Sequence, residues 1–343
     1  MEEFVRGMPK IELHAHLNGS LTTNMLEELA ETKFGLGSPE CEFYKEKIAD
    51  LRNFSSKNLS ECFKIFKISH ELITNLDLLK KATLLVIQKF HLDNTVYLEI
   101  RTTPKRCKEF TKLQYLETII DSIKESQSTY PEITVKLLPS FDRARGILDA
   151  EETLEVISQL IGKFPNTIVG LDISGDPSAG CFKDYKPLLI KAKLLGLRLA
   201  LHCAEIDGIE DETREMIEFG MDRMGHGTFI KDENLDLLKK NDICVECCLT
   251  SNIKCGTVKN YDDHHFNEMF FQHKIPVVIC TDDCGVFDTD LSKEILYAVD
   301  TFGLDKFDLF NLCKLGIKYS FTSDETKAII TNRVSAYFQN CKF

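Results

Sequence analysis

The chain has 343 residues, of which 43% are hydrophobic and 28% are charged, a composition typical of a soluble globular protein. Its formal net charge of −12 argues against broad binding to nucleic acid polymers or to an anionic membrane surface. The 13 cysteines are scattered, no apolar secretory signal begins the chain, and no run approaches about 18 apolar residues, so we expect a cytoplasmic protein with reduced thiols and no membrane span.

Short runs rich in valine, isoleucine and leucine alternate with amphipathic stretches along the chain. Eight of these runs are predicted strands, at 10–17, 96–101, 133–141, 167–173, 197–203, 222–226, 243–249 and 276–281. The stretches between them show helical periodicity, for example at 112–128, 149–163, 184–195 and 290–302. Strands that alternate with helices imply parallel pairing through crossover connections.

Eight parallel strands can close into a (β/α)8 TIM barrel, which leaves no edge strand exposed. A doubly wound open sheet is the alternative, but the chain lacks both GxGxxG after its first strand and GxxxxGK[ST]. The segment 18–95 leaves room for two or three extra helices over the barrel mouth, and 290–340 is predicted to be all helical, with a helix start in SDET (323–326). No linker or repeat interrupts 1–343, so we expect one domain.

The most informative short stretch is IELHAHLNGSL at residues 11–21. Side chains alternate faces along a strand, so His14 and His16 lie on one face and can reach the same metal ion. An isolated HxH can equally belong to a half-exposed strand with no ligand. Polar residues that end three other predicted strands favour the metal: His202 and Glu205 in LHCAE, His226 in GHG, and Asp282 and Asp283 in TDD.

Chemistry in such barrels lies at the C-terminal ends of the strands, so these side chains are expected to converge. Three imidazoles, from His14, His16 and His202, and the carboxylate of Asp282 suit a zinc ion with one position open for water. Two-metal barrels often carry a modified lysine at the end of the fourth strand. Here that strand ends in LDISGDP, which favours a single ion.

The remaining polar residues at these strand ends suit proton transfer and substrate contact. Glu205 follows His202 by three residues, so it can lie beside the metal without binding it and act as a proton shuttle. His226 can orient or polarise the attacking water, and Asp283 can contact the substrate. Each residue alone could be an ordinary buried polar group, but a whole cluster of ionisable groups needs a compensating partner.

The sequence resembles the adenosine deaminase family over nearly its whole length. The shared motifs, in the family's order, are HAHLNGS (14–20), SGDP (174–177), LHCAE (201–205), GHGTF (225–229), LTSN (249–252) and TDDCGVF (281–287). The resemblance implies a TIM barrel of the metal-dependent hydrolase type that deaminates purines at C6. It implies one zinc ion bound by His14, His16, His202 and Asp282, with Glu205 as proton donor to the purine ring, His226 acting on the attacking water, and Asp283 and the Gly175 backbone as purine contacts.

Other stretches resemble the adenosine deaminase-like members of that family, which act on N6-methyl-AMP and give IMP and methylamine. These stretches are AHLNGS, ECFKIFKISHEL, RTTPKR, FDRARG and YDDHHF. In RTTPKR (101–106) two hydroxyls and three cations stand near the expected mouth, and Arg143 and Arg145 follow the third strand. This positive patch suits a 5′-phosphate, although Lys105 and Arg106 can also be ordinary solvated charges. The resemblance implies substrate contacts from His16, Asn18, His70, Thr102, Thr103, Pro104, Lys105, Asp142, Gly175, Glu205 and Asp283.

Two further motifs are interpreted as structural. Cys244 and Cys247 form a CxxC within a predicted strand, where they face opposite sides and cannot readily share a metal. The run DDHH, from Asp262 to His265, is expected to begin a helix with an aspartate as N-cap.

The leading hypothesis is a monomeric, zinc-dependent hydrolase of C–N bonds that converts N6-methyl-AMP and related N6-substituted purine nucleoside monophosphates. Deamination of adenosine or 2′-deoxyadenosine to inosine is the alternative. A catalytically inactive purine-binding barrel and a protein-binding scaffold are two further classes, which metal content and turnover assays would distinguish.

Overall fold

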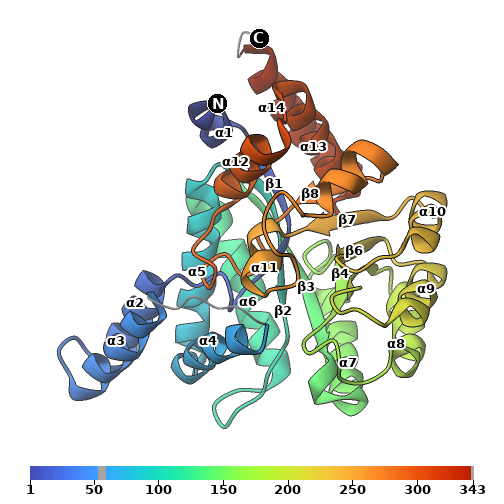
Figure 1. Ribbon diagram of the computed structural model, residues 1–343. Helices are drawn as coiled ribbons and strands as arrows, with labels where there is room; N and C mark the ends of the chain where they lie inside the picture. Colours follow the sequence, from blue (N-terminus) through green and yellow to red (C-terminus); the bar gives the residue numbers. More distant parts are fainter. Residues whose placement is uncertain (53–58, 341–343) are drawn as a thin grey trace.

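The structure is a computed structural model that describes residues 1–52 and 59–340 (Figure 1). Eight strands form one sheet in the order β1 to β8, and each strand runs parallel to its neighbour in the sequence. They are β1 (Lys10–His16), β2 (Thr95–Thr102), β3 (Thr134–Asp142), β4 (Gly170–Ser174), β5 (Arg198–Cys203), β6 (Arg223–His226), β7 (Cys244–Cys247) and β8 (Val277–Ile279). The expected TIM barrel and all eight expected strands are confirmed.

The barrel closes between its last and first strands through a few specific contacts. The backbone of Asp282 donates to the carbonyl of His14 at 2.8 Å and accepts from His16 N at 3.1 Å. The buried carboxylate of Glu12 accepts from His14 N at 2.8 Å and from Thr281 N at 3.0 Å. Closure at this end therefore places the end of β1 directly against the segment that follows β8.

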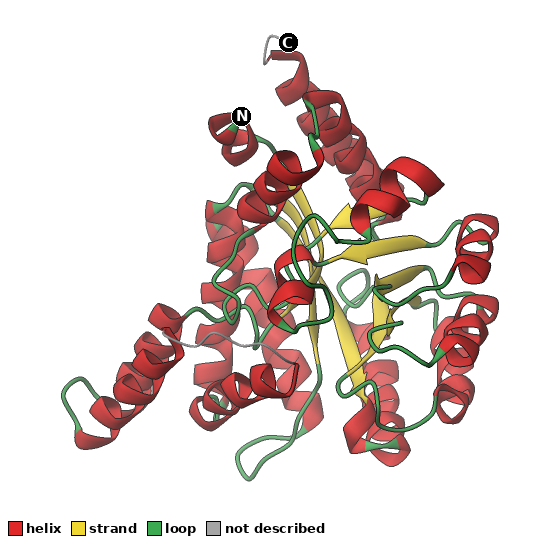
Figure 2. Ribbon diagram, viewed as in Figure 1, coloured by secondary structure: helices red, strands yellow, loops and turns green. Residues whose placement is uncertain are grey.

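Helices surround the strands, as Figure 2 shows with helices in red and strands in yellow. The helices between successive strands from β1 to β7 include α5 (Leu76–Leu92), α6 (Lys112–Thr129), α7 (Ile147–Lys163), α8 (Phe182–Leu194), α9 (Glu210–Phe219) and α10 (Asp232–Lys240). A 3₁₀ turn, η1 (Arg143–Arg145), follows β3, and α11 (Leu249–Lys254) and the π-helix η2 (Glu268–His273) follow β7. None of the helices in the described part of the chain has the length and apolar character to cross a membrane.

Additional helices occur after β1 and after β8, where the sequence predicted them, and also before β1, where it did not. α1 (Glu2–Gly7) precedes the barrel, and α2 (Thr23–Phe34), α3 (Pro39–Arg52) and α4 (Leu59–Leu72) lie in the insertion after β1. The C-terminal region consists of α12 (Leu291–Phe302), α13 (Lys306–Tyr319) and α14 (Asp324–Asn340). The predicted start in SDET is confirmed, since Ser323 Oγ accepts from Thr326 N at 3.3 Å at the beginning of α14.

The expected helix start at DDHH is wrong. Asp262 and Asp263 lie in a turn, and the next helical residue is Phe266. The carboxylate of Asp263 accepts from the side chain of Asn260 at 2.8 Å and caps no helix N–H. Aspartate is favourable at an N-cap, but here Asp263 and Asn260 hydrogen-bond to each other within the turn that precedes the helix.

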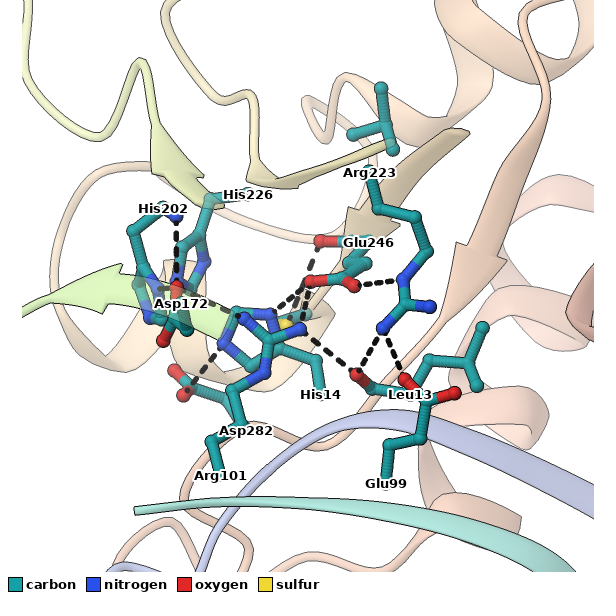
Figure 3. A network of polar contacts seen from close by, with 12 residues as sticks. Leu13, His14, Glu99, Arg101, Asp172, His202, Arg223, His226, Glu246 and Asp282 are labelled. Atoms are coloured by element: carbon teal, nitrogen blue, oxygen red, sulfur yellow. Dashed lines mark hydrogen bonds and ion pairs between the residues drawn. The ribbon is translucent and has the colours of Figure 1, made fainter. Parts of the chain in front are cut away.

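Apolar side chains fill the space between the sheet and the helices, whereas the inside of the barrel is strongly polar. Along β2, Leu98 and Ile100 are buried in the main apolar core. Glu99 and Arg101 alternate with them, and both are fully buried. Because side chains on a strand alternate between its two faces, the charged set points into the barrel, where Figure 3 shows it forming a network.

Phe321, which follows α13, plugs the N-terminal end of the barrel. Its ring stacks on the guanidinium of Arg223, with 3.7 Å from Cζ to the ring centroid, and lies near Arg198 at 4.9 Å. A side chain on Gly170 would approach this ring to 2.7 Å, so the start of β4 must be a glycine for the ring to fit.

We expect Phe321→Ala to lower the free energy of unfolding by about 3–5 kcal/mol, because it opens a cavity and uncovers a buried arginine. Urea denaturation followed by circular dichroism measures this change. The control is Ile329→Ala on α14, whose side chain is 63% exposed and which should change the value by less than about 0.5 kcal/mol. Equal effects of the two substitutions would contradict the role of Phe321 as a plug.

Candidate active site

A cavity of about 500 Å³ opens at the C-terminal ends of the strands. Phe66, Lys67, His70 and Glu71 of α4 form part of its wall, so the expected position at the mouth is confirmed for this one of the inserted helices. The lining also contains most residues singled out from the sequence: His16, Asn18, Thr102, Thr103, Asp142, Gly175, His202, Glu205, His226, Asp282 and Asp283. Pro104, Lys105 and His14 are not among the lining residues, and the side chain of His14 is fully buried.

Four side chains meet at the base of the cavity in an arrangement that could hold a metal ion. One donor atom from each of His14, His16, His202 and Asp282 lies within 4.8 Å of the others. Nε2 of His16 is 3.1 Å from Nε2 of His202, and Oδ1 of Asp282 is 3.3 Å from Nε2 of His16 and 3.4 Å from that of His14. Nε2 of His14 is buried and makes no hydrogen bond. Such an orphaned acceptor facing three others suits a cation.

Each of three potential ligands is held from behind by a second polar side chain. Nδ1 of His14 lies 2.7 Å from Oε2 of Glu246, and Nδ1 of His202 lies 2.9 Å from Oδ1 of Asp172. Oδ2 of Asp282 accepts a 2.6 Å hydrogen bond from Ser251 Oγ. Carboxylates behind imidazoles are typical of metal sites, because they fix the tautomer that leaves Nε2 free.

Sequence reasoning missed Asp172, Glu246 and Ser251. A usable signal existed for two of them, since Asp172 in GLDIS and Glu246 in ICVEC are single charged residues inside apolar strands. Such residues need a buried partner.

The backbone is strained at three of the strand ends that form the site. Ala204, His226 and Asp282 have φ values of 54°, 63° and 59°, in the left-handed region that residues other than glycine rarely adopt. Strain of this kind concentrates at functional sites, where the surrounding fold imposes it. Here the left-handed backbone turns the chain abruptly at the end of each of these strands. Side chains close in sequence, such as His202 and Glu205, therefore face the same cavity.

Glu205 and His226 form a pair beside the cluster of four donors, with 3.6 Å between Oε1 and Nε2. Burial raises the pKa of Glu205 above its ordinary value. Burial also lowers the pKa of His226, which keeps its imidazole neutral. The pair therefore combines a carboxyl that holds its proton more tightly than usual with an uncharged imidazole.

His226 is itself held by helix α11 and the turn that follows it, both after β7. The amide Nδ2 of Asn252 lies 3.4 Å from Nδ1 of His226, and Nε2 of His264 lies 3.1 Å from the Asn252 amide oxygen. Nε2 of His265 donates to the His226 carbonyl at 2.9 Å. The histidines of DDHH thus support the site from behind, as a structural interpretation predicts. Cys244 and Cys247 are buried free thiols, which agrees with their interpretation as core residues.

The predicted positive patch is largely wrong. The Arg101 side chain is fully buried and pairs with Glu246. Arg143 binds Glu212 at 2.7 Å, and Arg106 is exposed and binds Glu152 at 3.0 Å. Arg145 remains as a lining residue, with its Nε 3.3 Å from Asp142 Oδ2. The sequence placed five cations near the mouth but did not show which way they point.

A smaller positive region does remain at one end of the cavity. Lys105 donates to the carbonyl of Ile73 at 3.0 Å, just behind the lining. The cavity walls, and then the charges of Lys105 and Arg145, lower the pKa of His70 to about 4. Burial is the larger cause of this shift, and both cations lie close enough to His70 to disfavour its protonated form further.

Comparisons with known proteins identify the same family over nearly the whole chain. A family model described as adenosine deaminase matches residues 9–337. The adenosine deaminase-like protein of Drosophila melanogaster is 44% identical over 337 residues, which cover 98% of each chain. The N6-methyl-AMP deaminase of Homo sapiens is 37% identical, covering 95% of this chain and 92% of that protein. The crystal structure of arabidopsis ADAL complexed with IMP matches with a TM-score of 0.89 at 35% identity, covering 98% of this chain and 99% of that one.

We expect Gly19→Ala to displace Asp283 from the cavity wall. An added Cβ would lie 1.6 Å from Oδ1 of Asp283, whose buried side chain cannot remain in place. A crystal structure of the variant should show the moved carboxylate, and the free energy of unfolding should fall by about 1–3 kcal/mol. The control is Gly162→Ala on α7, where nothing lies within 4 Å and where stability should rise by up to about 1 kcal/mol. An unmoved Asp283 would refute this prediction.

Proposed function

The chain belongs to the adenosine deaminase family, and we propose that it is a zinc-dependent deaminase of N6-methyl-AMP and related N6-substituted purine nucleoside monophosphates, giving IMP and an amine. The observation that carries the proposal is the convergence of a four-donor cluster, a proton-holding carboxyl and a neutral imidazole on one cavity. We also propose that residues 1–343 act as one deaminase barrel domain.

The residues present fit a divalent cation. His14, His16, His202 and Asp282 offer three imidazole nitrogens and one carboxylate oxygen, a donor set that suits zinc. The charges behind them also favour a cation. In the connected network of Figure 3, Arg101 and Arg223 contact three carboxylates, and a fourth joins the network through His14. Those carboxylates are Glu99, Asp172, Glu246 and Asp282. A divalent cation would neutralise the excess negative charge, which is costly to bury.

When bound, zinc supplies a Lewis acid that makes water a nucleophile at neutral pH. Around it, Glu205 holds a proton that it can give to the purine ring as water adds to C6 and the amine leaves. Its raised pKa suits that role. With Asn252 donating to Nδ1, Nε2 of His226 carries the ring hydrogen and can orient the attacking water as a hydrogen-bond donor.

Two further groups are proposed to contact the purine. Asp283 lines the cavity next to Asp282. Gly175 adopts φ +91°, and a Cβ there would lie 2.3 Å from Oδ1 of Asp142. Only glycine lets the backbone at this point approach both Asp142 and a flat ring in the cavity. We propose that the Gly175 backbone and the Asp283 carboxylate bind the two edges of the base.

The nucleotide preference rests on the positive end of the cavity. The chain as a whole has a formal charge of −12, so a local group of cations at the cavity favours an anionic part of the substrate at this point. Arg145, His70 and Thr103 line that end, with Lys105 behind them. We propose that they bind the 5′-phosphate. This agrees with the relatives in Homo sapiens and arabidopsis, which are described as N6-methyl-AMP deaminase and as an IMP complex.

A substrate panel with N6-methyl-AMP, AMP and adenosine tests the proposal, with the metal content measured on the same sample. We expect kcat/KM for N6-methyl-AMP to exceed that for adenosine by about 10- to 100-fold, because each hydrogen bond to a charged phosphate contributes about 1.5–3 kcal/mol. Arg145→Ala should remove most of this preference by raising KM for the nucleotide alone. Arg106→Ala, on an exposed cation paired with Glu152, is the control. A preference for adenosine would overturn the nucleotide assignment in favour of a nucleoside deaminase.

We expect Glu205→Gln to lower kcat by about 10²- to 10⁴-fold while zinc content stays at the wild-type level, because the amide keeps the shape but has no acidic proton to give. His14→Ala should lose both zinc and turnover. Steady-state rates and plasma emission spectrometry on the purified variants measure the two quantities. His273→Ala is the matched control, since that imidazole lies outside the cavity lining, is 31% exposed and pairs with Glu268. A fully active Glu205→Gln would exclude the proton-donor role.

A further inference from the structure

The side chain of Arg101 lies directly beneath the site, inside the barrel (Figure 3). It extends from β2 and is fully buried. Nη2 donates to Oε2 of Glu246 and, at 2.9 Å, to the carbonyl of Leu13. Nη1 lies 3.6 Å from Oδ1 of Asp172. One guanidinium therefore contacts two carboxylates that come from different strands, β4 and β7.

Those two carboxylate oxygens are the same atoms that hold two of the proposed metal ligands. Oε2 of Glu246 is 2.7 Å from Nδ1 of His14, and Oδ1 of Asp172 is 2.9 Å from Nδ1 of His202. Each imidazole thus uses Nδ1 toward a carboxylate and turns Nε2 toward the other ligands. The guanidinium contacts the same two oxygens.

The physical consequence follows from the shape and charge of arginine. A guanidinium that contacts a carboxylate oxygen restricts the position of that oxygen, and the oxygen in turn orients the imidazole N–H that it accepts. The planar fork can contact two oxygens at once, whereas a lysine ammonium is a single point of charge. Outer partners of this kind set the orientation of metal-binding imidazoles.

We propose that Arg101 is a positioning residue that couples the two carboxylate–histidine pairs and thereby sets the geometry of His14 and His202 together. This inference rests on the proposed zinc site and deepens it. The sequence context of Arg101, EIRTTP, predicted a phosphate contact instead of this role.

The structure offers a matched control in Arg223, the second fully buried arginine of the network. Nε of Arg223 contacts the other oxygen of Glu246, Oε1, at 2.6 Å, and Nη2 binds Glu99. Nη1 donates to the carbonyl of Tyr319 at 2.8 Å. Among the described residues, the carboxylates that Arg223 contacts are those of Glu246 and Glu99, whereas Arg101 contacts those of Glu246 and Asp172.

The test compares Arg101→Lys with Arg223→Lys in the full chain. Zinc affinity is measured by chelator competition, and the coordination geometry by the visible absorption spectrum of the cobalt-substituted protein. Urea denaturation of the metal-free protein measures stability separately. We expect Arg101→Lys to weaken zinc binding by about 10- to 100-fold and to alter the cobalt spectrum. Arg223→Lys should lower stability but shift zinc affinity by less than about threefold. A purely structural role for Arg101 would leave its cobalt spectrum unchanged.

The outcomes separate this inference from the proposed function. Wild-type zinc binding with unchanged affinity and spectrum in Arg101→Lys overturns the inference alone, whereas no zinc binding by the wild-type chain overturns the proposed function. If Arg101→Lys does not fold, Glu246→Gln and Asp172→Asn address the same coupling. Their effects on zinc affinity should be less than additive in the double variant, because one guanidinium serves both carboxylates. Additivity within about twofold would overturn the coupling.

Discussion

The hydrogen bond between Nδ1 of His14 and the carboxylate of Glu246 is the interaction on which the site depends. It joins β1 to β7 across the inside of the barrel and turns Nε2 of His14 toward the other donors. Because the Glu246 carboxylate is fully buried, it requires compensating cations, which Arg101 and Arg223 provide. The orientation of one ligand therefore imposes a charged interior on a barrel whose core is more often apolar.

This charged interior links stability to metal binding. The arginines offset part of the negative charge, and the rest faces the position where four donor atoms meet. An uncompensated buried charge is destabilising, so a cation at that position would stabilise the fold as well as enable chemistry. Asp282 likewise serves both the fold and the site. Its backbone pairs with β1 where the barrel closes, and its side chain supplies one of the four donor atoms.

The sequence predicted residue types better than directions. His70 and Thr103 lie on the cavity wall as expected, and one of the three inserted helices, α4, forms part of that wall. Arg101 was expected at the mouth and instead lies beneath it, because a side chain two residues after Glu99 on one strand must share its inward face. Alternation along β2 contained this information, but the neighbouring hydroxyls and cations of RTTPKR concealed it.

The sequence alone determined the order of strands and helices, the barrel they form and the donor set at the strand ends, because periodicity and short motifs are local properties. Tertiary structure alone decided which buried partner holds each donor. Asp172 and Glu246 lie about 30 and 230 residues from the histidines they orient, and no local pattern joins them. Their roles arise from barrel closure, which brings distant strands to one axis and places their buried charged side chains in contact.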